Sequence, residues 1–183
     1  YAATDGDEKQ EALETVQAFL AAEEERMAVS GVRGNFVRMY VKPGIDGLSC
    51  PEDDESYRAD EEKDDNRWVK LDGDGCLTWL PVEGDEWVDS GVCAGSDYAN
   101  WCFLDNTSKD EYSGHMFALG AVLKLVDDET SQSIAKRLIT DVVDELLEND
   151  LWMSDADGRT TAHGDFSPAY GAGFNAAMFL GFL

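Results

Sequence analysis

The stretch SKDEYSGHMFALGAVLKLV, residues 108–126, begins the helical hairpin that decides the fold we expect for this chain. Apolar side chains recur along it every three or four residues, which is the period of an amphipathic helix. After a short polar break at residues 127–130, SQSIAKRLITDVVDELLE (131–148) repeats the pattern. Two long helices with so short a link run antiparallel, as an αα-hairpin.

The first turn of this hairpin carries a helix-capping signal. Ser108 stands three residues before Glu111, the spacing of a capping box in which the hydroxyl and the carboxylate each bind a free backbone amide. Asp110 adds negative charge where the helix dipole favours anions. Capping therefore explains part of the polar stretch DNTSKDEYSGH, residues 105–115.

Four further elements are predicted along the chain. Glu-rich residues 8–28 have a helical apolar face, and the turn DGDG within residues 68–80 indicates a β-hairpin. Residues 152–166 predict a second hairpin or loop, and a third helix follows from residue 168 to the chain end. We expect a mainly α fold.

The 183 residues suit a single domain that is long enough to bury a substantial core. We divide it into a helical start (1–44), a cysteine-containing loop and β-hairpin region (45–104), and the helical hairpin with its C-terminal helix (105–183).

Four cysteines lie in the middle region: Cys50, Cys76, Cys93 and Cys102. None forms the CxxC pair of a zinc ribbon. Their even number predicts two disulfides in an oxidising compartment, extracellular or periplasmic, and the alternative is four reduced thiols. Because short loops close most easily, we favour the pairs Cys50–Cys76 and Cys93–Cys102.

The formal net charge of −25 excludes several partners. Nucleic acids need basic residues to displace their counterions, and anionic membranes repel an acidic surface. No apolar run approaches the roughly 18 residues of a membrane span, so we expect no membrane insertion. The charge favours divalent cations or a cationic partner, and the alternative is a solvated surface adapted to salt.

Two stretches, LDGDG and SDADG, share an acid-x-acid-Gly form that suits oxygen ligation of a hard cation. The candidate calcium ligands are Asp72, Asp74, Asp155 and Asp157. The full twelve-residue calcium-loop pattern is missing. The alternative is two ordinary turns, since Asp-Gly is a common hairpin turn.

A second candidate site lies at the start of the helical hairpin. Acids, a phenol and an imidazole at a helix end can perform acid–base chemistry on a sugar or uronate. The candidate catalytic residues are Asp105, Asp110, Tyr112, His115 and His163. The alternative is that His115 is a hydrogen-bonded core histidine and that the acids are caps.

The last 80 or so residues carry a resemblance to a known class of proteins. DNTSKDEYSGHMFALGAVLKLVDD (105–128), the helix 131–150 and DADGRTTAHGDFSPAYGAGFNAAMFL (155–180) together resemble part of a secreted α/α-toroid protein. That class includes polysaccharide hydrolases and lyases, and extracellular proteins of unknown role. The resemblance implies helical hairpins around a central cavity into which the five candidate catalytic residues point.

Two functions follow from these patterns. The first is a secreted toroid protein that acts on polysaccharide as a hydrolase or lyase. The alternative is a non-enzymatic extracellular structural or assembly subunit that binds calcium. Because a complete toroid has more helices, and because FNAAMFLGFL at the chain end is apolar, we expect another chain or further polypeptide to pack on the C-terminal helix.

Overall fold

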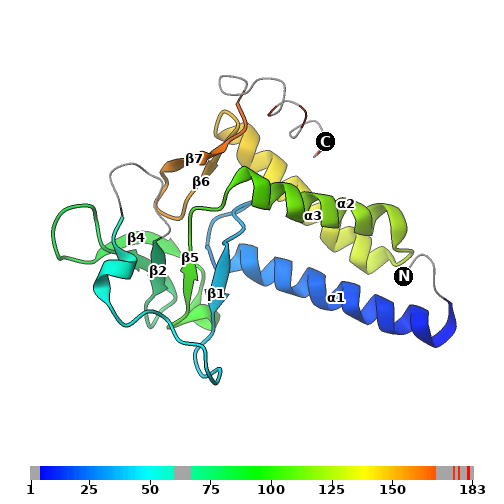
Figure 1. Cartoon of the computed structure of the whole chain (residues 1–183), viewed down its shortest axis with the longest axis horizontal. Helices are drawn as coiled ribbons and strands as arrows, with labels where there is room; N and C mark the ends of the chain where they lie inside the picture. The colour runs from blue at the N-terminus through cyan, green and yellow to red at the C-terminus, as the bar shows by residue number, and fades with distance from the viewer. Residues whose placement is uncertain (1–4, 60–66, 168–174, 176, 178–180, 182–183) are drawn as a thin grey trace.

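The computed structural model describes residues 5–59, 67–167, 175, 177 and 181. In this part of the chain, three long helices lie side by side at one end and a small antiparallel sheet forms the other end (Figure 1). The fold is therefore mixed α/β, and the expected mainly α toroid of helical hairpins is wrong. The toroid interpretation rested on the last part of the chain, and within residues 39–104 it allowed for only one β-hairpin, where the structure has a five-stranded sheet.

The three helices are α1 (Gly6–Ala28), α2 (Lys109–Leu125) and α3 (Glu129–Glu148). They confirm the helix predicted at residues 8–28 and the predicted αα-hairpin. The capping box is also confirmed, because the Ser108 hydroxyl accepts a hydrogen bond from the Glu111 amide at 3.4 Å. The Glu111 carboxylate in turn accepts one from the Ser108 amide at 2.8 Å.

The helices enclose one apolar core. Leu20 of α1, Leu119 of α2 and Leu138 of α3 are all fully buried in it. Phe36, from the segment that follows α1, packs into the same core. This segment therefore links the helical end of the molecule to the sheet.

The sheet contains β1 (Met39–Val41), β2 (Trp68–Leu71), β3 (Cys76–Trp79), β4 (Val88–Cys93) and β5 (Cys102–Leu104). Their spatial order is β1-β5-β2-β3-β4, and every neighbouring pair is antiparallel. The predicted hairpin is confirmed as β2 and β3. Two short 3-10 helices, η1 (Asp54–Tyr57) and η2 (Ser96–Tyr98), lie in the connections.

Two disulfides join Cys50 to Cys102 and Cys76 to Cys93. Two disulfides were predicted correctly, but the favoured pairs Cys50–Cys76 and Cys93–Cys102 are wrong. Sheet register decides the pairing, because Cys76 lies directly opposite Cys93 across β3 and β4. A preference for the shortest loops takes no account of that register.

A separate two-stranded hairpin consists of β6 (Trp152–Ser154) and β7 (Thr160–Asp165), as predicted. The side-chain amide of Asn35 donates a hydrogen bond to the Ser154 backbone carbonyl at 2.9 Å, so this hairpin is held against the segment after α1. The helix predicted from residue 168 onward lies outside the described residues. Within the described part, no helix is both long and apolar enough to cross a bilayer.

Candidate functional site

The five residues predicted to be catalytic lie in different environments. Tyr112 is buried, and its hydroxyl accepts a hydrogen bond from the Phe36 amide at 3.0 Å. Burial raises the pKa of the Tyr112 phenol well above its usual value, so the phenol stays neutral. Asp110 is exposed in the first turn of α2, and His163 is exposed on β7.

His115 lies between α1 and α2. Its Nδ1 is 2.7 Å from a carboxylate oxygen of Glu23, which is buried, and its ring stacks on Phe36 with 4.9 Å between centroids. These contacts place the His115 ring in the interface between α1 and α2. His115 is thus engaged in the packing of α1 against α2, whereas Asp110 and His163 are exposed.

A hollow with both polar and apolar lining lies elsewhere, between strands β3 and β4 and the turn that joins β6 to β7. We call it the aspartate groove, and its volume is about 470 Å³. Its apolar side is formed by Trp79, Val88 and Val92, and its acidic side by Asp89, Asp155 and Asp157. Such a mixture of apolar walls and a few polar groups is typical of binding sites.

Local turn chemistry positions the three aspartates. A carboxylate oxygen of Asp89 accepts a hydrogen bond from the Gly91 amide at 2.8 Å, and Gly91 adopts a φ of 71°, which favours glycine. In the β6–β7 turn, the Gly158 amide donates to the Asp155 carbonyl at 2.9 Å. Both turns thus present their acids toward the same groove.

A buried arginine, Arg67, pairs with Asp157, one of the aspartates that line the groove. The Arg67 guanidinium lies 2.8 Å from Asp157 and 3.3 Å from Asp105, and all three side chains are at most 5% exposed. It also lies 5.1 Å from the centre of the Trp79 ring, a cation–π contact. Asp105 accepts a further hydrogen bond from the Ala156 amide at 3.0 Å. Arg67 therefore ties β2 and the end of β5 to the β6–β7 turn.

Arg67 contacts two carboxyl groups, and their pKa values shift in opposite directions. Burial raises the pKa of Asp157, but the charge and hydrogen bonds of Arg67 outweigh this and hold that pKa below its usual value. Arg159 also pairs with Asp157. For Asp105, burial outweighs the attraction of Arg67, and its pKa is raised.

Acids remain in excess around the groove. Three aspartates, Asp89, Asp155 and Asp157, line the groove, and Arg67 and Arg159 both pair with Asp157. This surplus belongs to a chain with a formal net charge of −25. The groove therefore attracts positive charge.

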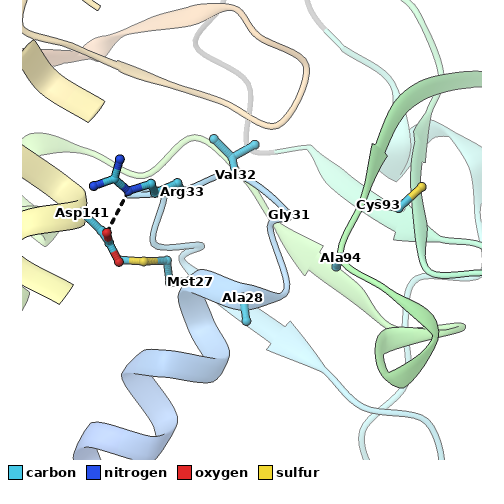
Figure 2. Close-up of a pocket in the computed structure, with 8 residues that line it drawn as sticks. All are labelled: Met27, Ala28, Gly31, Val32, Arg33, Cys93, Ala94 and Asp141. Carbon is cyan, nitrogen blue, oxygen red and sulfur yellow. Dashed lines mark hydrogen bonds and ion pairs between the residues drawn. The ribbon is translucent and has the colours of Figure 1, made fainter. Parts of the chain in front are cut away.

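A second hollow, with a volume of about 300 Å³, shares Val32 with the lining of the aspartate groove, and Figure 2 shows its lining residues. Its polar side chain, Arg33, binds Asp141 of α3 at 2.8 Å and also pairs with Asp144. A Cβ at Gly31 would lie 2.9 Å from Val92, so glycine lets this loop approach β4 closely. Since its arginine is already paired, this hollow is a weaker binding candidate.

Two of the aspartates predicted to bind calcium, Asp72 and Asp157, already have hydrogen-bond or ion-pair partners within the chain. One Asp72 oxygen accepts hydrogen bonds from the amides of Asp74 and Cys76, both at 2.9 Å, and these bonds lower the pKa of Asp72. Asp157 is occupied by its arginines. Over residues 5–59 and 67–167, no three or more His, Cys, Asp or Glu side chains gather as metal ligands. Calcium binding stays a prediction.

Comparison of the chain with protein-family models, with curated proteins and with solved structures finds no match. The site must therefore be judged by its geometry. The sequence had singled out Asp155 and Asp157, whereas Arg67 and Asp89 carried no local signal. Pairing of distant segments brings Asp89 beside the β6–β7 turn and Arg67 against Asp157.

Proposed function

We propose that this chain is a non-enzymatic extracellular binding or assembly protein that takes a cationic segment of a partner into the aspartate groove. The observation that carries the proposal is the groove itself, in which apolar side chains from β3 and β4 adjoin a surplus of carboxylates. The cationic segment is a stretch of peptide with lysine or arginine next to apolar residues.

A basic side chain has an apolar stem and a charged head, which match the apolar and the acidic lining of this groove. Lysine and arginine bury their alkyl stems against apolar surface while their charged heads reach polar groups. Val88 and Val92 offer such a surface, and the exposed Asp89 offers a carboxylate. The excess negative charge of the whole chain also accelerates the encounter with a cationic partner.

The positions of the predicted catalytic residues favour binding over catalysis. A general acid or base must reach a bound substrate, at hydrogen-bond distance or through one water. Tyr112 is buried against Phe36, and Asp105 is buried against Arg67. Hydrolysis or cleavage of polysaccharide stays a prediction that this geometry does not favour.

The compartment is consistent with the proposal. Two disulfides are typical of proteins that fold in an oxidising environment, such as the outside of a cell or the periplasm. There, partners with basic segments meet the acidic chain without competition from intracellular nucleic acid.

The test uses two synthetic peptides of equal length, one alternating leucine with lysine and the other leucine with glutamine. We expect the lysine peptide to bind and the glutamine peptide to bind at least tenfold more weakly, measured by calorimetry. Asp89→Asn keeps the acceptor for the Gly91 amide but removes a charge from the groove. It should weaken binding by roughly two- to fivefold, the usual effect of one exposed ion pair.

Asp74→Asn is the matched control, because Asp74 is an exposed aspartate in the β2–β3 turn outside the groove. It changes the net charge equally and should leave the affinity unchanged. Equal losses in both variants would show that the peptide senses only total charge. That result, or equal affinity for the two peptides, contradicts the proposal.

A further inference from the structure

The outer side of the helical hairpin carries a second, chemically opposite hollow, which we call the α2–α3 groove. Its volume is about 630 Å³, and its apolar lining includes Met116, Leu123 and Ile139 of the two helices, with Gly181 from near the chain end also in the lining. It continues into a hollow of about 350 Å³ that includes Phe117 and Leu125. Phe117 is 82% exposed, so this apolar track is open to solvent.

Gly120 keeps the floor of the groove open. It lies in the middle of α2, where glycine destabilises a helix relative to alanine. A Cβ at this position would meet no atom within 4 Å. Packing within the described chain therefore does not require glycine at Gly120. Gly120 lines both hollows, and because it has no side chain, the groove is deeper where the two hollows join.

Two lysines line this apolar track. Lys124 of α2 and Lys136 of α3 both face the groove, and within the described residues neither ammonium pairs with a carboxylate. The sequence has 14 basic residues against 39 acidic ones, so two unpaired lysines at one hollow are a local reversal of charge. An apolar track with positive charge complements an apolar molecule with a negative head.

We infer that the α2–α3 groove binds a free long-chain fatty acid. The alkyl tail would lie along the floor between Met116 and Ile139, and the carboxylate would pair with Lys124 and Lys136. A volume of about 630 Å³ is in the ordinary range for small-molecule sites. A free fatty acid is favoured over an anionic membrane because the chain as a whole, at −25, is repelled by such a surface.

The first experiment compares ligands on the wild-type chain by calorimetry, below their micelle concentrations. Dodecanoate and dodecyltrimethylammonium have the same tail and opposite heads. The net charge of the chain favours the cation, so tighter binding of dodecanoate, by at least tenfold, requires a local positive site. We also expect hexanoate, with half the tail, to bind far more weakly, and anionic vesicles not to bind.

Matched variants then locate the site. Gly120→Leu fills the floor and should weaken dodecanoate binding at least tenfold. Gly114→Leu is its control, because Gly114 lies on the same helix outside the groove and is also open around its Cβ position. Lys124→Gln combined with Lys136→Gln should weaken binding about five- to tenfold, and Lys70→Gln on β2 should not.

Several outcomes would overturn the inference. These are equal or tighter binding of the cationic amphiphile, unchanged affinity in Gly120→Leu, and binding of vesicles in place of the free acid. Light scattering tests the other occupant, a second copy of the chain. If Gly120→Leu turns a dimer into a monomer while dodecanoate binds neither form, the groove is a subunit interface and the fatty-acid site does not exist.

Discussion

At the scale of single residues, Arg67 is the side chain on which the contact between the sheet and the β6–β7 turn depends. Its guanidinium is 1% exposed and bridges Asp105 and Asp157. Removing one partner of a buried ion pair costs more than the pair contributes, because the other charge stays buried without compensation. Asp157 keeps Arg159 as a partner, so Asp105 is the group that would be stranded.

Arg67→Ala is predicted to lower the free energy of unfolding by about 3–5 kcal/mol at pH 7. The deficit should shrink as the pH falls toward 5. Without Arg67, the already raised pKa of Asp105 rises further, and the variant gains stability as Asp105 takes up a proton. The wild type gains less, because the charge of Arg67 favours the ionised form and keeps the pKa of Asp105 below its value in the variant.

Urea unfolding of both proteins at pH 7 and pH 5 measures this difference. Arg137→Ala is the control, because Arg137 is half exposed and pairs with Glu24 and Asp141 at the surface. It should cost less than about 1 kcal/mol at either pH. A deficit for Arg67→Ala that is the same at both pH values would contradict the assigned role of Asp105.

At the scale of elements, local signals predicted what local interactions form. The helical period, the Ser108–Glu111 capping box and the turn at residues 72–75 each involve neighbours in sequence, and the elements they predicted are present. Strand β5, by contrast, is three residues long and is defined by its pairing with β1 and β2. No period can appear in three residues, so β5, the strand that joins β1 to the predicted hairpin, was missed.

The same reason explains the wrong disulfide pairs and the missed groove. The Cys76–Cys93 pair follows from the register of β3 against β4, and the groove follows from the docking of β6–β7 beside β4. Both are long-range contacts that depend on which strands are neighbours. The resemblance to toroid proteins implied that helical hairpins pack beside one another around a central cavity. It therefore placed the candidate site in that cavity and not beside the sheet.

The two disulfides should differ in what they contribute to stability. They close loops with sequence separations of 52 and 17, for Cys50–Cys102 and Cys76–Cys93 respectively. Because longer loops lose more entropy in the unfolded chain, replacing each pair by alanine should cost about 4 and about 3 kcal/mol, in that order. Guanidinium unfolding measures both costs, and peptide mapping without reductant checks the pairing. A larger loss for the shorter loop would contradict this loop-entropy account.

At the scale of the whole molecule, the chain combines a large negative charge with two hollows, one proposed to bind a cationic ligand and the other an anionic one. Strands β3 and β4, which line the aspartate groove, and helices α2 and α3, which line the α2–α3 groove, lie in different parts of the molecule (Figure 1). The two grooves share no lining residue among the described ones, so occupation of one does not require the other. Failure of the fatty-acid inference would therefore leave the cationic-partner proposal intact, and the reverse also holds.

The net charge of −25 predicts how the folded state responds to salt. Like charges held close together in the compact state repel, and this repulsion is relieved on unfolding. Raising NaCl from about 0.1 M to about 1 M shortens the Debye length from about 10 Å to about 3 Å. Relief of about 1–2 kcal/mol of repulsion should raise the melting temperature by about 2–8 °C for a chain of this length.

Calorimetric melting in NaCl, and in CaCl₂ and MgCl₂ at matched ionic strength, separates screening from a specific site. Screening alone gives CaCl₂ and MgCl₂ the same effect. A rise specific to calcium that Asp74→Asn or Asp155→Asn abolishes would establish one of the predicted aspartate pairs as a ligand set. A melting temperature that falls or stays constant as NaCl increases would show that repulsion among the surface acids does not limit stability, because their ion pairs then contribute at least as much as their repulsion costs.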